Sequence, residues 1–566
     1  MLRERLSIYL SGLWHRKQHE QHWSTDSRFL GAVSVLILLL FYLDGVVESF
    51  KEPKGKARAS QYQTFIRNFY KFVSKRILAW GYLFDGPGSI QRAYRVSGGA
   101  PFEILAPDTR MVFVSSPEDI KELDRVPDDV LSLNGAAKHM LQPVYTMNGF
   151  NWFDRRGVEG VGFVRTLRSL LTQNLPLLLP DLSRLARVRW AELLEKKGTL
   201  RDGAIHAPVY PMMLDLVVLM NARSLFGEDL IKDTRFMTSA LSYVEETLLT
   251  AEIVKLLPRF LAPAVGGFLG WALRSHKTFF QSLIPATEQH IQETERKSLG
   301  HTVPRRADCI QWIIDTAPKQ NPWPAERVIY ELMAIWFGSV HILSTTIVYA
   351  IHDLCLHPEY VKPLRQELET CYKEFERTGG RDAGGALPLL DSFLKESARL
   401  TPVDSMSIRR CALQPYSLST GTHSLEVGDW ACAPSGAINL SATYYTSPDE
   451  FSGFSFVPPS RVPDDGWWKK RDGSSTSSSS LPMQSTPSSL TDVDSSWLMW
   501  GTGRMACPGR HYATAFMKTV VAQLLLDYDF KLAEPGSKRW ISWRVAKIPK
   551  PWTKVLFVPR NRECIY

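Results

Sequence analysis

The sequence predicts a mainly α-helical protein with a small β portion, preceded by one membrane-spanning helix. Residues 29–47 form an apolar run, helical patterns dominate from about residue 60 to 320, and a mostly apolar stretch without proline covers residues 325–356. Extended patterns stand out at residues 111–114 and 403–440. A chain of 566 residues that is 44% hydrophobic can bury a large core.

The apolar run at residues 29–47 carries a single charge, Asp44, near its end. A helix of this length, at about 1.5 Å per residue, spans roughly 28 Å, close to the thickness of a bilayer core. No small-residue cleavage site follows, so we predict an uncleaved anchor rather than a signal peptide or a buried core helix. Basic residues flank both ends, so charge alone leaves its orientation open. The anchor separates an N-terminal segment (1–28) from a linker (48–60) and one folded domain (61–566).

The stretch from Pro324 to Leu356 predicts one unusually long helix. At 1.5 Å per residue it would be about 50 Å long. It is apolar on most sides but contains Arg327, Glu331, His341 and Asp353. These residues favour a central buried helix over a second membrane span. Gly338 and Ser339 in its middle are small enough to let another group approach the backbone.

Charge and cysteine usage limit the possible partners. Lys and Arg number 67 and Asp and Glu 58, and the resulting net charge of +9 is spread along the chain. Such a surface fits a membrane or an acidic protein; without a zinc-finger spacing or a basic arm, no nucleic-acid partner is predicted. The seven Cys include no C-x-x-C pair, which argues against a disulfide framework. Residues 473–496 are rich in Ser and predict a low-complexity surface loop.

The sharpest motif is W-G-T-G-R-M-A-C-P-G-R at residues 500–510, a glycine-rich loop that delivers Cys507 to the start of a helix. A helix N-terminus and neighbouring Arg residues favour a thiolate. Gly501, Gly503 and Gly509 let the backbone pass close to a flat group and turn amides towards the sulfur. One Cys without a second Cys or His nearby cannot form a tetrahedral zinc site, but it suits the axial position of a heme. The alternative is a buried structural Cys.

Glu396 and Arg399 form a second motif, three residues apart on one face of a helix that begins at Pro388 and ends before Pro402. Alone, such a pair is common on solvated surfaces. Arg399 lies 108 residues before Cys507. This position relative to the Cys507 loop makes the pair stronger evidence than it would be alone.

In this order, the anchor, the long helix, the Glu-x-x-Arg pair and the Cys loop resemble the cytochrome P450 family. The loop is similar to the family pattern F-G-x-G-R-x-x-C-P-G. The PDDVLS and MLQP stretches at residues 127–132 and 140–143 resemble the fungal members anchored in the endoplasmic reticulum, which oxidise terpenoids and other secondary metabolites. The resemblance covers essentially the whole chain.

The resemblance implies the cytochrome P450 fold and a heme b whose iron has Cys507 as its axial thiolate. Electron donation from this thiolate favours O–O cleavage. Glu396 and Arg399 would form a structural ion pair on the proximal side of the heme. Arg504 would touch the heme because of its place in the loop, and Arg409 or Arg410 would pair with a heme propionate, while Gly501, Gly503 and Gly509 shape the loop. His341 and Ser344 are catalytic candidates in the long helix, which the resemblance places over the distal face; for His341 a satisfied core histidine is the equal alternative.

The implied activity is hydroxylation or a related oxidation of a lipophilic small molecule, with O2 and electrons from NADPH delivered by a flavoprotein reductase. The positive charge would meet an acidic reductase. The resemblance further implies a single-pass protein of the endoplasmic reticulum membrane whose catalytic domain faces the cytosol. Two other functions stay open: an oxygen-independent heme-thiolate isomerase or dehydratase, and a degenerate heme-binding protein.

The chain departs from the family pattern at several positions. Ile342 stands where the family has a Thr that helps deliver protons to bound oxygen, so Ser344, Thr345 or a water would have to substitute. Met505 stands where Arg or His usually holds a propionate. Trp500 replaces a Phe, a change that we expect to be tolerated. Residues 454–456 read Phe-Ser-Phe and lack the Arg expected to join the ion pair; Arg461 is the nearest replacement in sequence.

Overall fold

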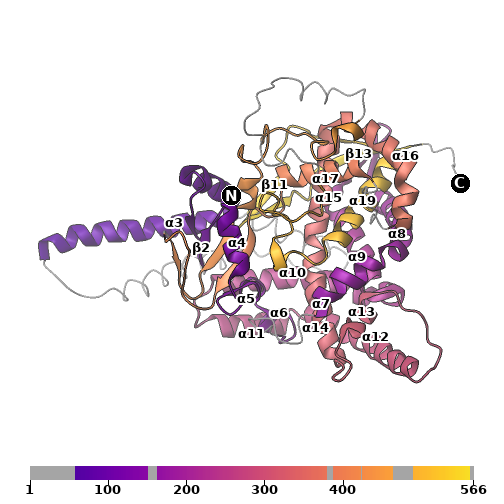
Figure 1. The fold of residues 1–566 in the computed structure, drawn as a ribbon, viewed down its shortest axis with the longest axis horizontal. Helices are drawn as coiled ribbons and strands as arrows, with labels where there is room; N and C mark the ends of the chain where they lie inside the picture. The colour runs from indigo at the N-terminus through magenta and orange to yellow at the C-terminus, as the bar shows by residue number, and fades with distance from the viewer. Residues whose placement is uncertain (1–57, 151–161, 379–386, 422, 463–487, 561–566) are drawn as a thin grey trace.

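The computed structural model describes residues 58–150, 162–378, 387–421, 423–462 and 488–560 (Figure 1). The predicted N-terminal segment, the anchor and all but the end of the linker lie outside the described residues, as do residues 473–487 of the predicted Ser-rich loop. Within the described ranges, the prediction of a mainly helical fold with a small β portion is confirmed.

The helices carry most of the described chain. They are α3 (Arg58–Ser97), α4 (Pro117–Arg125), α5 (Leu133–Leu141), α6 (Pro143–Thr146), α7 (Gly162–Arg165), η2 (Thr166–Leu171), α8 (Leu175–Lys197), α9 (Val209–Ile231), α10 (Thr234–Leu256), α11 (Ala262–Ala272), α12 (Ser275–Ser298), α13 (Cys309–Thr316), α14 (Ala325–Ser339), α15 (His341–Leu356), η3 (Pro358–Tyr360), α16 (Val361–Thr378), α17 (Pro388–Leu400), α18 (Ser435–Ile438), η4 (Pro459–Arg461), η6 (Gly503–Met505) and α19 (Arg510–Asp527).

Short strands form the β portion beside the helices. They are β1 (Phe102–Leu105), β2 (Arg110–Phe113), β3 (Leu131–Ser132), β4 (Thr199–Arg201), β5 (Ala204–Pro208), β6 (Ser407–Ala412), β7 (Tyr416–Ser417), β8 (Ser424–Leu425), β9 (Trp430–Ala433), β10 (Tyr528–Leu532), β11 (Trp540–Trp543), β12 (Ala546–Pro549) and β13 (Lys554–Pro559). The main sheet has the order β1-β2-β9-β6-β3, with β2 and β9 parallel and the other neighbours antiparallel. A second sheet has the order β10-β13-β5-β4.

Local signals place several helix ends where the sequence predicts them. Pro324 directly precedes α14, and α17 begins at Pro388. α15 packs against α9, α17 and α19, and Figure 1 shows α15, α17 and α19 together in the middle of the helical part. The largest apolar cluster includes residues of all four helices, so the core surrounds this central helix.

The long central helix is interrupted, contrary to the prediction of one continuous helix. α14 ends at Ser339, α15 begins at His341, and Val340 between them has φ −85° and ψ −65°. Two helical stretches among the described residues, Val209–Ile231 and Ala325–Leu356, are long and apolar enough to cross a membrane. Their most apolar windows are 72% and 67% buried inside the protein, so we assign both to the core, as predicted for the second.

Candidate active site

The loop before α19 holds Cys507 by backbone geometry. The Cys507 N–H donates to the Trp500 carbonyl at 2.7 Å, which closes the loop. Gly501 and Gly503 have φ of +73° and +56°, a region that favours glycine. A Cβ on Gly503 would also come within 2.8 Å of an Asp124 carboxylate oxygen. The glycines at these two positions are therefore needed for the loop to adopt this shape.

The first turn of α19 directs donors at the Cys507 sulfur. Burial raises the pKa of the Cys507 thiol, and the backbone N–H groups of Gly509 and Arg510, together with the Arg510 charge, act in the opposite direction. The predicted role of Gly509, an amide facing the sulfur, agrees with this geometry. The loop thus presents the sulfur of the half-buried Cys507 to hydrogen-bond donors that suit its thiolate form.

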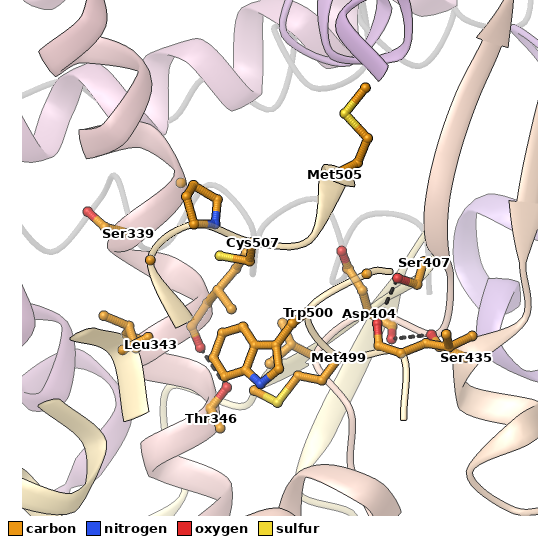
Figure 2. A pocket seen from close by; sticks show the side chains of 18 of the residues that line it. Ser339, Leu343, Thr346, Asp404, Ser407, Ser435, Met499, Trp500, Met505 and Cys507 are labelled. Carbon is orange, nitrogen blue, oxygen red and sulfur yellow. Dashed lines mark hydrogen bonds between the residues drawn. The ribbon is translucent and has the colours of Figure 1, made fainter. Parts of the chain in front are cut away.

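A cavity of about 470 Å³ opens above Cys507. One wall comes from the interrupted helix, whose residues facing the cavity include Gly338, Ser339, Ile342, Leu343 and Thr346. Figure 2 shows Ser339, Leu343 and Thr346 along this helix on one side of Cys507, with Asp404, Ser407 and Ser435 on the other. Leu133, Leu167 and Leu171 make the lining largely apolar.

Neither predicted catalytic residue of the long helix lines the cavity. The half-buried His341 has its Nδ1 3.5 Å from the Tyr210 hydroxyl of α9, and burial lowers the pKa of His341 to about 4. The buried Ser344 donates to the Val340 carbonyl at 2.8 Å. The two side chains lie one turn apart on the same face of α15. The structure therefore does not bring them to the site. His341 lies in the core, but its Nε2 has no hydrogen-bond partner among the described residues, so it is not the satisfied core histidine of the alternative.

Thr346 presents a hydroxyl to the cavity where the sequence points to Ser344. Ile342 faces the cavity and is 46% exposed, as expected for the position of the family's Thr. Thr346 follows it by four residues, which puts the two side chains on one helix face. The Thr346 Oγ1 donates to the Ile342 carbonyl at 2.8 Å. Thr346 replaces Ser344 as the candidate hydroxyl of this wall.

Two arginines of β6 reach the edge of the cavity. Successive strand residues normally face opposite sides of a sheet. Here the β6–β9 register shifts between Ser407 and Arg410, and Ile408 has φ +51°, so Arg409 and Arg410 both line the cavity. Arg409 pairs with Asp404 at 2.6 Å, and Arg410 is 3.4 Å from Asp124.

Arg504, in contrast, points away from the cavity. Its guanidinium donates to Asp128 at 2.9 Å and to the Val126 carbonyl at 3.0 Å, and its side chain is 49% exposed. The adjacent Met505 lines the cavity instead. The sequence motif favours Arg504 as a heme contact, whereas the structure places Arg409 and Arg410, and not Arg504, at the cavity.

Glu396 and Arg399 form a buried, two-bond ion pair in α17. Their hydrogen bonds measure 2.7 and 2.8 Å, and each side chain is 2% exposed. Arg399 also donates to backbone carbonyls of the segment that follows α18, at Asn439, Pro448 and Glu450. Neither residue lines the cavity, so the geometry fits the structural role and not direct contact with a cofactor.

Backbone groups satisfy this pair where the expected third arginine is missing. The Ser452 N–H donates to Glu396 at 2.8 Å. Ser455, which stands at the position of that arginine, is exposed, and so is Arg461, its nearest replacement in sequence. A backbone donor thus supplies the carboxylate with a further hydrogen bond.

A family model described as cytochrome P450 matches residues 77–553. The chain belongs to the cytochrome P450 family. The sequence is 28% identical to Cytochrome P450 monooxygenase 71 of Postia placenta over 82% of this chain and 86% of the relative. It is also 28% identical to Cytochrome P450 monooxygenase olcJ of Penicillium canescens, over 81% of each.

The P450 fold is confirmed by a solved structure. The retinoic-acid-bound cyanobacterial CYP120A1 matches with a TM-score of 0.59 and 16% identity, covering 85% of this chain and 96% of the other. At this identity the likeness concerns the fold alone.

The residues of this P450 fit the heme that the family carries. Cys507 offers the single sulfur, the apolar wall suits the porphyrin, and Arg409 and Arg410 sit at one edge where two carboxylates could bind. Three buried polar atoms of cavity-lining residues, Arg409 Nε, Asn439 Oδ1 and Thr502 Oγ1, have no hydrogen-bond partner among the described residues. Such atoms are normally satisfied, so they fit a site built for a polar-edged ligand.

Three residues near the site carry no recognisable sequence motif. Asp404 and Tyr512 line the cavity, and the buried Asn221 of α9 bonds to the interrupted helix. The sequence indicates Thr346 only weakly: it lies four residues, about one helical turn, after Ile342. Asn221 has none, since its partner lies 118 residues away.

Proposed function

We propose that this cytochrome P450 is a monooxygenase that hydroxylates a lipophilic small molecule, with a terpenoid or similar secondary metabolite as the substrate class. The observation that carries the proposal is Cys507, held with backbone donors at the floor of a largely apolar cavity. Relatives that match over most of the chain are named monooxygenases, which supports the same reaction type.

The heme, when bound, supplies the oxygen chemistry through its thiolate-ligated iron. The protein holds the heme and encloses the substrate. Cys507 provides the ligand, and the amides of Gly509 and Arg510 stabilise its charge. Ile342 and Leu343 exclude water and orient an apolar substrate, while the Thr346 hydroxyl can hold a proton at the cavity wall.

We propose that electrons come from NADPH through a flavoprotein reductase. The net charge of +9 supports an acidic partner. The test is reconstitution of the heme-loaded protein with reductase, NADPH and candidate terpenoids. Product that needs O2, NADPH and reductase supports the proposal; product formed in their absence refutes it.

An oxygen-independent isomerase or dehydratase is the second candidate. Ile342 favours it, because its side chain faces the cavity at the proton-delivery position and cannot hydrogen bond. The same reconstitution separates the two candidates. The spectrum of the reduced carbon-monoxide complex addresses the third possibility, a degenerate heme-binding protein, which predicts no thiolate-type Soret band.

For localisation we propose a single-pass protein of the endoplasmic reticulum, with residues 29–47 as anchor and the catalytic domain in the cytosol. The mostly exposed Phe260, Phe268 and Trp271, in and beside α11, support contact with lipid, because aromatic side chains favour the membrane interface. Protease protection in microsomes tests the orientation. Resistance of the domain to added protease would contradict it.

A further inference from the structure

A side chain from another helix bonds to the backbone at the interruption of the central helix. Sharp breaks usually arise at proline, at Gly/Ser pairs, or where a side chain inserts into the hydrogen-bond ladder, and Gly338-Ser339 directly precedes this break. No proline occurs between residues 325 and 356, while Asn221 of α9 donates through its Nδ2 to the Ser339 carbonyl at 3.0 Å. In a continuous helix this carbonyl would accept from the Leu343 N–H instead.

Asn221 is itself held by the helix that follows Cys507. The Tyr512 hydroxyl of α19 donates to the Asn221 Oδ1 at 2.9 Å. A carbonyl only accepts, so the amide must turn its NH2 to Ser339 and its oxygen to the Tyr512 hydroxyl. Burial raises the pKa of the Tyr512 phenol, which keeps this donor protonated. Asn221 is fully buried and so is its bond to Tyr512, whereas its bond to the cavity-lining Ser339 is partly buried.

This bridge joins the two sides of the cavity. Tyr512 lies five residues after Cys507, and Ser339 belongs to the wall formed by the central helix; all three line the cavity. The first backbone bond at the start of α15 runs from the Ser344 N–H to the Val340 carbonyl at 3.2 Å. The N–H groups of the first turn, including those of Ile342 and Leu343, are released from the ladder, as at any helix start.

We propose that Asn221, oriented by Tyr512, is a positioning residue that keeps the central helix open beside Ile342. The open turn offers peptide hydrogen-bonding groups at the wall where the Ile342 side chain offers none. These groups can hold a water or a proton near the reacting oxygen, so the bridge supports coupling of electron use to product formation. The inference has a structural half, that Asn221 keeps the helix open, and a catalytic half, that the open turn supports coupling. Only the catalytic half rests on the proposed monooxygenase function.

The structural half is tested by hydrogen exchange of the peptide covering residues 337–344. Asn221→Leu keeps the size of the side chain and removes both bonds, so the helix ladder closes across Val340. Closure protects the released amides, and we expect their exchange to slow about tenfold, the effect of one added hydrogen bond. Simple loosening of the core would speed exchange. Unchanged or faster exchange therefore overturns the inference.

Tyr512→Phe is the second variant, in case Asn221→Leu does not fold. It leaves the Asn221–Ser339 bond but removes the group that orients the amide, so exchange should change in the same direction and by less. Tyr243→Phe is the matched control, because the buried Tyr243 hydroxyl donates to the Met333 carbonyl of α14 away from the break. In the control, exchange at residues 337–344 should equal that of the wild type; slowing there as well overturns the assignment.

The catalytic half is measured as product formed per NADPH consumed in the reconstituted system. We expect Asn221→Leu to lower this ratio severalfold and to raise hydrogen peroxide release, with substrate KM within about twofold and Tyr243→Phe unaffected. An unchanged ratio alongside slowed exchange overturns the positioning role. If the wild type gives no NADPH-dependent product, the proposed function fails, and exchange alone still decides the structural half.

Discussion

Replacement of Arg410 tests how this P450 holds heme without the usual basic residue at position 505. Arg410 is a buried cavity-lining side chain, and its guanidinium lies 3.4 Å from Asp124, longer than a good charge-assisted bond. It therefore has donors to spare for a propionate. Arg410→Gln keeps a shorter polar side chain and removes the charge.

The size of the effect follows from the bonds that are lost. A hydrogen bond to a charged group contributes about 1.5–3 kcal/mol, which corresponds to about 10- to 150-fold in an equilibrium constant. Because Arg410 is buried, solvent does not screen this contribution as it would at the surface. We therefore expect heme dissociation from Arg410→Gln to be at least about tenfold faster.

Transfer of heme to an excess of apomyoglobin measures the dissociation rate without any assay of activity. Arg504→Gln is the matched control: its side chain is half exposed and engages Asp128, away from the cavity. It should release heme within about twofold of the wild-type rate. If Arg504→Gln loses heme as fast as Arg410→Gln, the assignment of the propionate contacts to β6 is refuted.

Further predictions concern the sulfur, the cavity wall, the core histidine and the ion pair. Cys507→Ala should abolish heme-dependent activity and the thiolate-type Soret band of the reduced carbon-monoxide complex. Ile342→Thr should raise product per NADPH, and Thr346→Val should lower it severalfold. His341 has a folded pKa of about 4, below its unfolded value, so stability should rise with pH between about 4 and 6.5, and His341→Gln should flatten this slope in urea unfolding. Arg399→Leu strands a buried carboxylate and should lower the free energy of unfolding by about 3–5 kcal/mol.

The parts of the site that the sequence predicts well are those made by neighbouring residues. The Cys507 loop depends on glycines within a few positions of the cysteine. Gly501 and Gly503 adopt the positive φ that favours glycine at these positions. The Glu396–Arg399 pair needs only one helical turn to form. Local spacing determines both arrangements, so a motif contains most of the needed information.

Sequence patterns predict the site wrongly where an irregularity or a distant partner changes which side chains face the cavity. The irregularity at Ile408 turns two successive arginines to the cavity, which regular strand alternation would not predict. Closeness to Ile342 in sequence favours Ser344, but helix periodicity puts Thr346 on that face. The break at Val340 follows the Gly338-Ser339 pair, but the Asn221 side chain that bonds to Ser339 comes from another helix, and no sequence spacing marks that contact.

At both departures from the family pattern, Met505 and Ile342, another residue that lines the cavity supplies a polar group. Met505 removes a propionate donor, and the β6 irregularity brings Arg409 and Arg410 to the same cavity. Ile342 removes a hydroxyl, and Thr346 presents one a single turn along the same face. An enzyme without oxygen chemistry would have no need for the second replacement. This favours the monooxygenase over the isomerase, and it requires that Thr346→Val impair coupling while leaving heme binding intact.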